Sequence, residues 1–200
     1  LTNVSMGTGG ADAETVEHAK RHAPLTFRRQ DRLVTLSDYI NFASTHISSY
    51  GSAGKATAVV REAFSSANII DVYLLEKASN LQLRRATPEY KTSLLDAINV
   101  KKMLTDEVVV VDGLIRTLDL VVTVRIDKEF KRLVRDVILN YFFVDNREFG
   151  QSFHTQDLVR QIHEIDKVRF ATIENIPESI TFEHNEISQL NNVTINLITI

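Results

Sequence analysis

Residues 117–126 have the sequence TLDLVVTVRI, and this segment decides the fold class. Every second side chain from Leu118 to Ile126 is apolar, which predicts a β strand with one face on a hydrophobic core. An amphipathic helix capped by Asp127 is expected at 128–142, because apolar side chains there follow helical spacing. The side chains predicted to face inward are Phe130, Leu133, Val134, Val137, Ile138, Tyr141 and Phe142.

Similar strand and helix signals recur on both sides of this segment. Upstream, they predict a helix at 36–47, strands at 55–63 and 68–76, a helix at about 89–104 and a strand at 107–111. Gly51 and Gly54 are expected in a flexible loop before the first strand. Downstream, we expect a loop at 145–152, a helix capped by Thr155, and a strand at 167–174. This order favours an α+β fold, with helices on one face of small, mostly antiparallel sheets.

The predicted elements divide the chain into four parts. Residues 1–34 are expected to form a Gly-rich linker and a helical arm, and residues 35–86 a first small α/β sandwich-like unit. Residues 87–176 are expected to form a second such unit, because the order helix-strand-strand occurs twice. Residues 177–200 are polar and then β-prone, which predicts an extended C-terminal β tail that pairs with something outside the compact units.

The composition excludes several classes of protein. The chain has 200 residues, of which 44% are hydrophobic and 24% charged, so it can bury a core and is not disordered. Its net charge of -3 argues against a general nucleic-acid or anionic-membrane binder. It has no cysteine for a disulfide or thiolate, and no apolar run of the roughly 20 residues that a membrane helix needs. Because it begins at Leu1, we expect it to be part of a longer protein.

We find no motif for catalysis, for a cofactor or for a metal ion. His18 and His22 are four residues apart, but Lys20 and Arg21 between them would repel a cation. The segment 51–56 lacks the glycine and the Ser or Thr of a phosphate-binding loop, and no serine lies in a GxSxG elbow. Two alternatives stay open: an enzyme fragment that uses His18, His22 or Lys55, and a ferredoxin-like nucleic-acid module that uses the basic cluster at 28–32.

Two ordered motifs bring a known family into consideration. The first motif comprises Gly9, Gly10, Asp12, Glu14, Pro24, Arg32, Thr35, Asp38 and Tyr39. The second is FGQS at 149–152, followed by Asp157, Leu158, Ile162 and the pair Lys167-Val168. Together with the strand and helix between them, they resemble the baseplate J family of contractile-tailed phages over residues 7–174. Lys167 stands where that family usually has glycine, and the tail is unmatched.

That resemblance implies a structural protein of the virion's tail baseplate, assembled in the cytoplasm of the bacterial host. Its size and tail look most like the wedge-ring member of the family in T-even-like phages. Such proteins dimerise, contact other wedge and hub proteins and link the wedges into a ring, without a cofactor, nucleic acid or membrane. A baseplate-like protein of a bacterial contractile injection system is the alternative.

The motif residues have structural interpretations. Gly9 and Gly10 would let the chain bend, and Thr35 and Asp38 would form a capping box at the start of the first helix. Tyr39 would anchor that helix on the sheet. Gly150 would adopt a positive φ before the last helix. On this interpretation the function lies in interfaces made by helix faces, the basic cluster and the tail.

Overall fold

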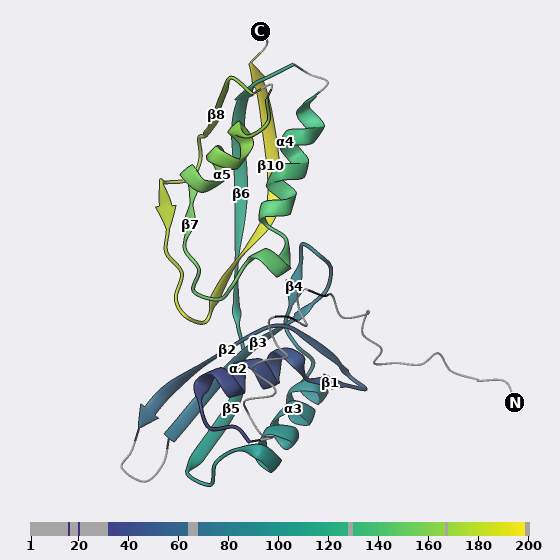
Figure 1. The fold of residues 1–200 in the computed structure, drawn as a ribbon, viewed down its shortest axis with the longest axis vertical. Helices are drawn as coiled ribbons and strands as arrows, with labels where there is room; N and C mark the ends of the chain where they lie inside the picture. Colours follow the sequence, from purple (N-terminus) through teal and green to yellow (C-terminus); the bar gives the residue numbers. More distant parts are fainter. Residues whose placement is uncertain are drawn as a thin grey trace, which may run out of the picture. The chain divides into compact units, whose positions relative to one another are not determined.

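The computed structural model describes residues 16, 20, 32–63, 68–127, 130–166 and 168–198. It has the mixed α+β fold that the sequence predicts. The chain divides into two compact units (Figure 1). Unit 1 contains residues 1–77 and 84–113, and unit 2 contains residues 78–83 and 114–200.

Unit 1 is a mixed sheet with two helices. In chain order its elements are α2 (Leu36–Thr45), β1 (Ile47–Ser48), β2 (Gly51–Ala63), β3 (Asn68–Lys77), β4 (Leu83–Arg84, of which Leu83 belongs to unit 2), α3 (Pro88–Lys101) and β5 (Asp106–Asp112). The strand order is β1-β2-β3-β4, and β5 pairs with β3. The pair β2 and β3 is antiparallel, whereas β5 runs parallel to β3 because α3 carries the chain back to the same end of the sheet. Its core includes the fully buried Tyr39, Leu74, Tyr90, Leu94 and Ile98.

Unit 2 is a three-stranded sheet with two helices, a short 3-10 helix and a short second sheet. Its elements are β6 (Leu114–Arg125), α4 (Lys131–Tyr141), η2 (Val144–Asn146), β7 (Phe153–His154), α5 (Thr155–His163), β8 (Phe170–Ile173), β9 (Ser179–Ile180) and β10 (Glu186–Ile198). The main sheet has the order β10-β6-β8, and β7 pairs with β9. The alternation predicted for β6 is confirmed, since the side chains predicted to face inward, Leu118, Leu120, Val122 and Val124, are at most 9% exposed. They pack with α4 and α5 in one core.

The prediction for the C-terminal segment is wrong. Residues 186–198 form β10, which pairs in parallel with β6 along nearly its whole length. Ile187 and Ile195 are buried in unit 2, so this strand is part of the fold rather than a free tail. The alternation in residues 193–198 correctly indicated a strand. However, a period of two reports only that one face is apolar and says nothing about the partner strand.

The expected domain boundaries at 86/87 and 176/177 do not coincide with the two units. Residues 87–113 lie in unit 1 because β5 pairs with β3, and residues 177–198 lie in unit 2 because β10 pairs with β6. Both pairings are parallel and join segments that are distant in sequence. The expected helix-strand-strand repeat contains neither of them.

The expected loop at Gly51 and Gly54 is a strand. β2 begins at Gly51, and its register with β3 shifts between Ala53 and Lys55. A side chain at Gly54 would place its Cβ 2.6 Å from the backbone nitrogen of Lys77. The glycine is therefore needed for close contact between two strands, which is a common use of glycine at a bulge.

Two predicted caps and one predicted core residue are also wrong. α4 begins at Lys131 with Phe130 as its N-cap and no side-chain cap, so Asp127 does not have that role. Thr155 lies inside α5, where its hydroxyl donates to the carbonyl of Glu178 at 3.1 Å. Leu133 is 47% exposed, because the buried stripe of α4 is narrower than the apolar stripe in its sequence.

The contrast between Leu133 and its neighbour Val134 predicts different effects of a new charge on α4. Val134 is fully buried, so Val134→Asp would place a carboxylate in the core of unit 2 without a partner. We expect this change to lower the free energy of unfolding by about 3–5 kcal/mol. Leu133→Asp is the matched control and should change it by less than about 0.5 kcal/mol. Urea unfolding followed by circular dichroism measures both, and equal losses would contradict the burial of α4.

Candidate functional site

The described end of the first motif, from Arg32 to Tyr39, leads into the start of α2 in unit 1. Thr35 is the N-cap, and its hydroxyl accepts a hydrogen bond from the backbone N–H of Asp38 at 3.3 Å. The carboxylate of Asp38 accepts in return from the N–H of Thr35 at 2.8 Å, so the predicted capping box is present. Arg32 precedes the box and is exposed. The remaining members, Gly9, Gly10, Asp12, Glu14 and Pro24, lie outside the described residues.

Tyr39 joins α2 to the sheet through a buried hydrogen bond. Its hydroxyl donates to Oδ2 of Asp106 at 2.8 Å, and both residues are buried. The other oxygen of Asp106, at the start of β5, accepts from the side-chain amide of Asn68 at 3.2 Å. Burial and the bond to Asp106 raise the pKa of Tyr39 well above its ordinary value. The hydroxyl therefore stays protonated and keeps donating at physiological pH.

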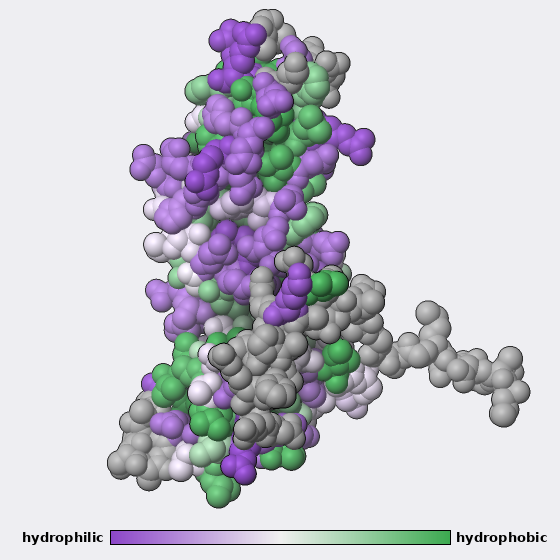
Figure 2. Space-filling view, in the orientation of Figure 1, coloured by the Kyte–Doolittle hydropathy of each residue, from purple (hydrophilic) through white to green (hydrophobic). Residues whose placement is uncertain are grey.

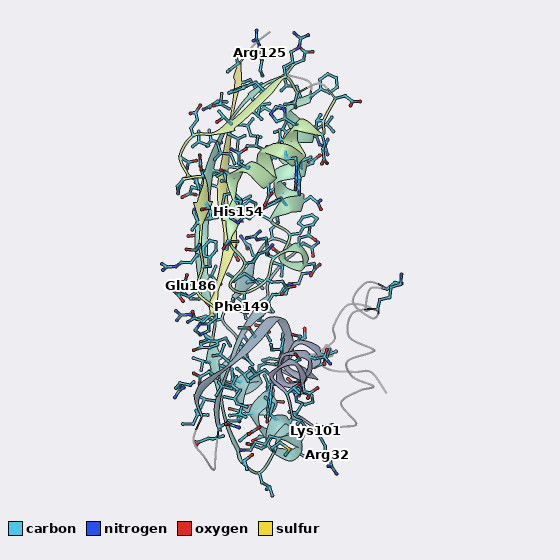
Figure 3. The ribbon with its side chains drawn as sticks, turned by 60° about the vertical axis from the view of Figure 1, so that its left-hand side comes forward. Arg32, Lys101, Arg125, Phe149, His154 and Glu186 are labelled. Atoms are coloured by element: carbon cyan, nitrogen blue, oxygen red, sulfur yellow. The ribbon has the colours of Figure 1, made fainter. Side chains whose placement is uncertain are left out.

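Gly150 of the second motif forms a tight turn in unit 2. Its φ is 68°, and its N–H donates to the carbonyl of Glu186 at 2.8 Å. A Cβ at this position would lie 3.4 Å from the Cα of His184, so little room is left for a side chain. The buried carboxylate of Glu186 also accepts from Nε of Arg116 at 2.8 Å. Figure 3 labels Phe149 and Glu186, which lie together where β10 begins.

Asp157 and Leu158 lie in the first turns of α5. Leu158 is fully buried in the core of unit 2. The Asp157 carboxylate lies 3.5 Å from a guanidinium nitrogen of Arg160, one turn along the helix, and both side chains are about half exposed or more. The described motif residues therefore occupy two places, with Arg32 to Tyr39 in unit 1 and Gly150 to Leu158 in unit 2. Thr35, Asp38 and Tyr39 stabilise α2, Gly150 forms a turn, and Leu158 packs in the core of unit 2.

Of the residues that the enzyme alternative uses, only Lys55 lies in the part of the chain that the structure describes. His18 and His22 lie outside it. Lys55 is buried and pairs with Leu75 between β2 and β3, so it does not lie in a phosphate-binding loop. Among the described residues, no group of three His, Asp or Glu side chains is placed to hold a metal ion. No helix in the described ranges is long and apolar enough to span a membrane.

Sequence reasoning missed Arg147, a buried cation next to the second motif. Arg147 is 2% exposed and donates from Nε to the hydroxyl of Ser188 at 3.0 Å. Its guanidinium lies 5.4 Å from the ring centroid of Tyr141, which favours a cation–π contact. Burial lowers the pKa of Arg147 below its ordinary value. In the sequence this arginine falls in a predicted polar loop, so nothing there marks it as buried.

Exposed apolar side chains gather at the end of α3 in unit 1. Leu104 is fully exposed and Val100 is 84% exposed, and Met103 lies between them in sequence. Val34 is also exposed and lies close by, because the N–H of Leu33 donates to the carbonyl of Lys101 at 3.0 Å. We call Val34, Val100, Met103 and Leu104 the α3-end patch.

The surroundings of this patch suggest a contact surface. Figure 3 shows Arg32 and Lys101 close to each other, and both are near neighbours in sequence of patch residues. Figure 2 shows hydrophobic side chains gathered in parts of both units, among hydrophilic ones, on the face that it draws. Single exposed apolar side chains are normal, but a group of them bordered by charges is typical of a protein contact surface.

The fold is that of a two-unit α+β protein. No protein-family model matches the chain, and no curated protein matches its sequence. A solved structure does match: a chain of the anti-feeding prophage baseplate, from a six-fold symmetrised cryo-EM structure. The TM-score is 0.54 and the identity 10%, over 89% of this chain and 42% of that chain. At this identity the match shows a shared fold, and this chain spans less than half of the baseplate chain.

The conformation of Gly150 predicts a graded response to substitution. Gly150→Ala should lower the free energy of unfolding of unit 2 by about 1–2 kcal/mol, since an L side chain at φ 68° is strained. Gly150→Asn should cost less, because asparagine tolerates the left-handed region better than alanine. Chemical denaturation of the two variants and the unmodified chain measures the order. If the alanine variant is the more stable of the two, strain at this turn is not what requires glycine.

Proposed function

We propose that this chain is a structural component of the baseplate of a contractile tail or contractile injection system. The observation that carries the proposal is the fold that it shares, over 89% of its length, with a chain of the anti-feeding prophage baseplate. The ordered motifs at residues 9–39 and 149–158 resemble the baseplate J family independently of that fold. The structural roles of the described motif residues also fit a protein that acts through its surfaces.

In its finer form, the proposal is that copies of the chain dimerise and link neighbouring wedges into a ring around the hub. The α3-end patch supports it, since exposed apolar groups of this kind favour burial against a partner. The motif resemblance favours the phage wedge, and the structural match favours a contractile injection system. Both assignments place the chain in the same kind of particle.

The first test asks whether the chain is part of such a particle. In the source organism, a chain with an affinity tag should sediment with intact contractile particles and be found at their baseplate end by antibody labelling in electron microscopy. Deletion of the gene should leave particles without assembled baseplates. Complementation with the intact chain should restore assembly. Normal particles in the deletion strain, or a tagged chain that stays at the top of the gradient, would overturn the proposal.

The second test concerns dimerisation and uses the α3-end patch. Light scattering after size exclusion should show a dimer whose fraction grows with concentration. Leu104→Asp should shift the equilibrium toward monomer by about tenfold or more, since interface centres tolerate charge poorly. Leu133→Asp changes a leucine of unit 2 that is 47% exposed and does not belong to the patch, and it should leave the mass unchanged. A monomer at every concentration would contradict dimerisation while leaving the particle test unaffected.

A further inference from the structure

β10 leaves one long side of the main sheet in unit 2 without a neighbouring strand. It lies at the end of the order β10-β6-β8, so among the described residues it pairs with β6 alone. Backbone N–H and C=O groups on its outer side are not used in this sheet. Such an edge is a template for an added strand, and natural proteins usually shorten, cover or charge it. β10 is 13 residues long and contains a single charged residue, Glu186 at its start.

A groove of about 440 Å³ runs along this edge. One wall consists of the six consecutive residues 190–195 of β10. Because side chains alternate between the faces of a strand, six consecutive lining residues mean that the wall is the edge and not one face. The other walls are α4 and residues 81 and 82, which belong to the same unit.

The groove is closed at the end next to Gln189, and this limits the part of the β10 edge that a partner strand can reach. The side-chain oxygen of Gln189 accepts from the N–H of Leu83 at 2.7 Å, so chain already lies beside β10 at this point. The next irregularity is a register shift with β6 between Leu190 and Asn192. The side chain of Asn191 is held there by a 2.9 Å bond to Asp119. The regular edge that remains, residues 192–198, spans roughly 20 Å, enough for a strand of about six residues.

The charge of the groove selects the kind of partner. Lys131 and Arg135 lie one turn apart on α4, and both are exposed. The lining contains these two cations and no carboxylate. The polar β10 residues in the wall are the neutral Asn191, Asn192 and Thr194. A strand with acidic side chains would therefore gain both backbone hydrogen bonds and opposite charge.

We infer that the β10 edge binds an extended acidic segment of another protein by strand addition. A second copy of this chain fits less well, because antiparallel pairing of two β10 edges would bring two α4 helices with the same positive residues together. The inference rests on the geometry of unit 2 and does not require the baseplate assignment. It also concerns a different surface from the α3-end patch of unit 1.

The test uses the 200-residue chain and a synthetic peptide. The probe is a nine-residue peptide of alternating valine and glutamate with a fluorescent label, whose binding is measured by anisotropy. Hydrogen exchange of the chain is measured with and without the peptide. We expect slower exchange of the amides at 192–198, and weaker binding at higher salt. A peptide of the same pattern with lysine in place of glutamate should not bind. A third peptide, N-methylated at alternate residues, should also fail, because it lacks strand hydrogen-bond donors.

Charge-reversed variants on α4 test the groove itself. Lys131→Glu together with Arg135→Glu should weaken binding of the glutamate peptide about tenfold, because the variant loses two exposed ion pairs with the peptide. Arg132→Glu is the matched control, because Arg132 lies on the same helix, is 90% exposed and does not line the groove. It should change the affinity by less than about twofold, and all variants should keep the melting temperature of the unmodified chain.

Several outcomes would overturn the inference. These are no slowing of exchange in β10, equal weakening by Arg132→Glu, or tight binding of the N-methylated peptide. Protection of β10 that grows with the concentration of the chain alone would show that a second copy occupies the edge. If the variant with both Lys131→Glu and Arg135→Glu does not fold, two measurements on the unmodified chain still test strand addition. These are binding of the N-methylated peptide and the pattern of hydrogen exchange.

Discussion

The parallel pairing of β6 with β10 is the constraint on which unit 2 depends. It joins residues 114–125 to residues 186–198, and every helix of the unit lies between them in sequence. The apolar side chains of β6 need a second strand to complete the surface on which α4 and α5 pack. The Arg116–Glu186 ion pair and the bond from Gly150 to Glu186 hold the start of β10 in place. The glycine of the second motif therefore acts on the same pairing.

In unit 1, buried hydrogen bonds likewise hold together two parallel strands that are distant in sequence. Its parallel pair, β3 and β5, is closed by Asp106, which accepts from both Tyr39 and Asn68. A buried carboxylate needs such partners, because an unsatisfied one is costly. The tyrosine of the first motif thus fixes α2 against β5. In both units, residues that resemble family motif positions make hydrogen bonds at a pairing between strands that are distant in sequence.

The sequence predicts the individual helices and strands, but it does not predict which distant strands pair or which side chains the fold buries. The strand at 117–126 and the capping box at Thr35 and Asp38 depend on residues within about ten positions, so their patterns are visible in the chain. The partner of β10 depends on residues about 70 positions away, and alternation carries no information on it. The apolar stripe in the sequence of α4 includes Leu133 and therefore predicts a core position. Only part of that stripe is buried, and Leu133 lies outside the buried part. Arg147 was missed because burial of a loop cation depends on aromatic neighbours brought by the fold.

Because β10 pairs with β6 on one side, its other side is an open sheet edge on the surface of unit 2. Among the described residues β10 is the end strand of its sheet, so its outer backbone groups need water or another chain as hydrogen-bond partners. β10 is protected by covering at Gln189 and by the register shift at Leu190, but its last residues carry no charged side chain. In a protein that stays alone in solution such an edge is a risk of aggregation. In a protein built into a large assembly, the same edge is a surface that a neighbouring chain can complete.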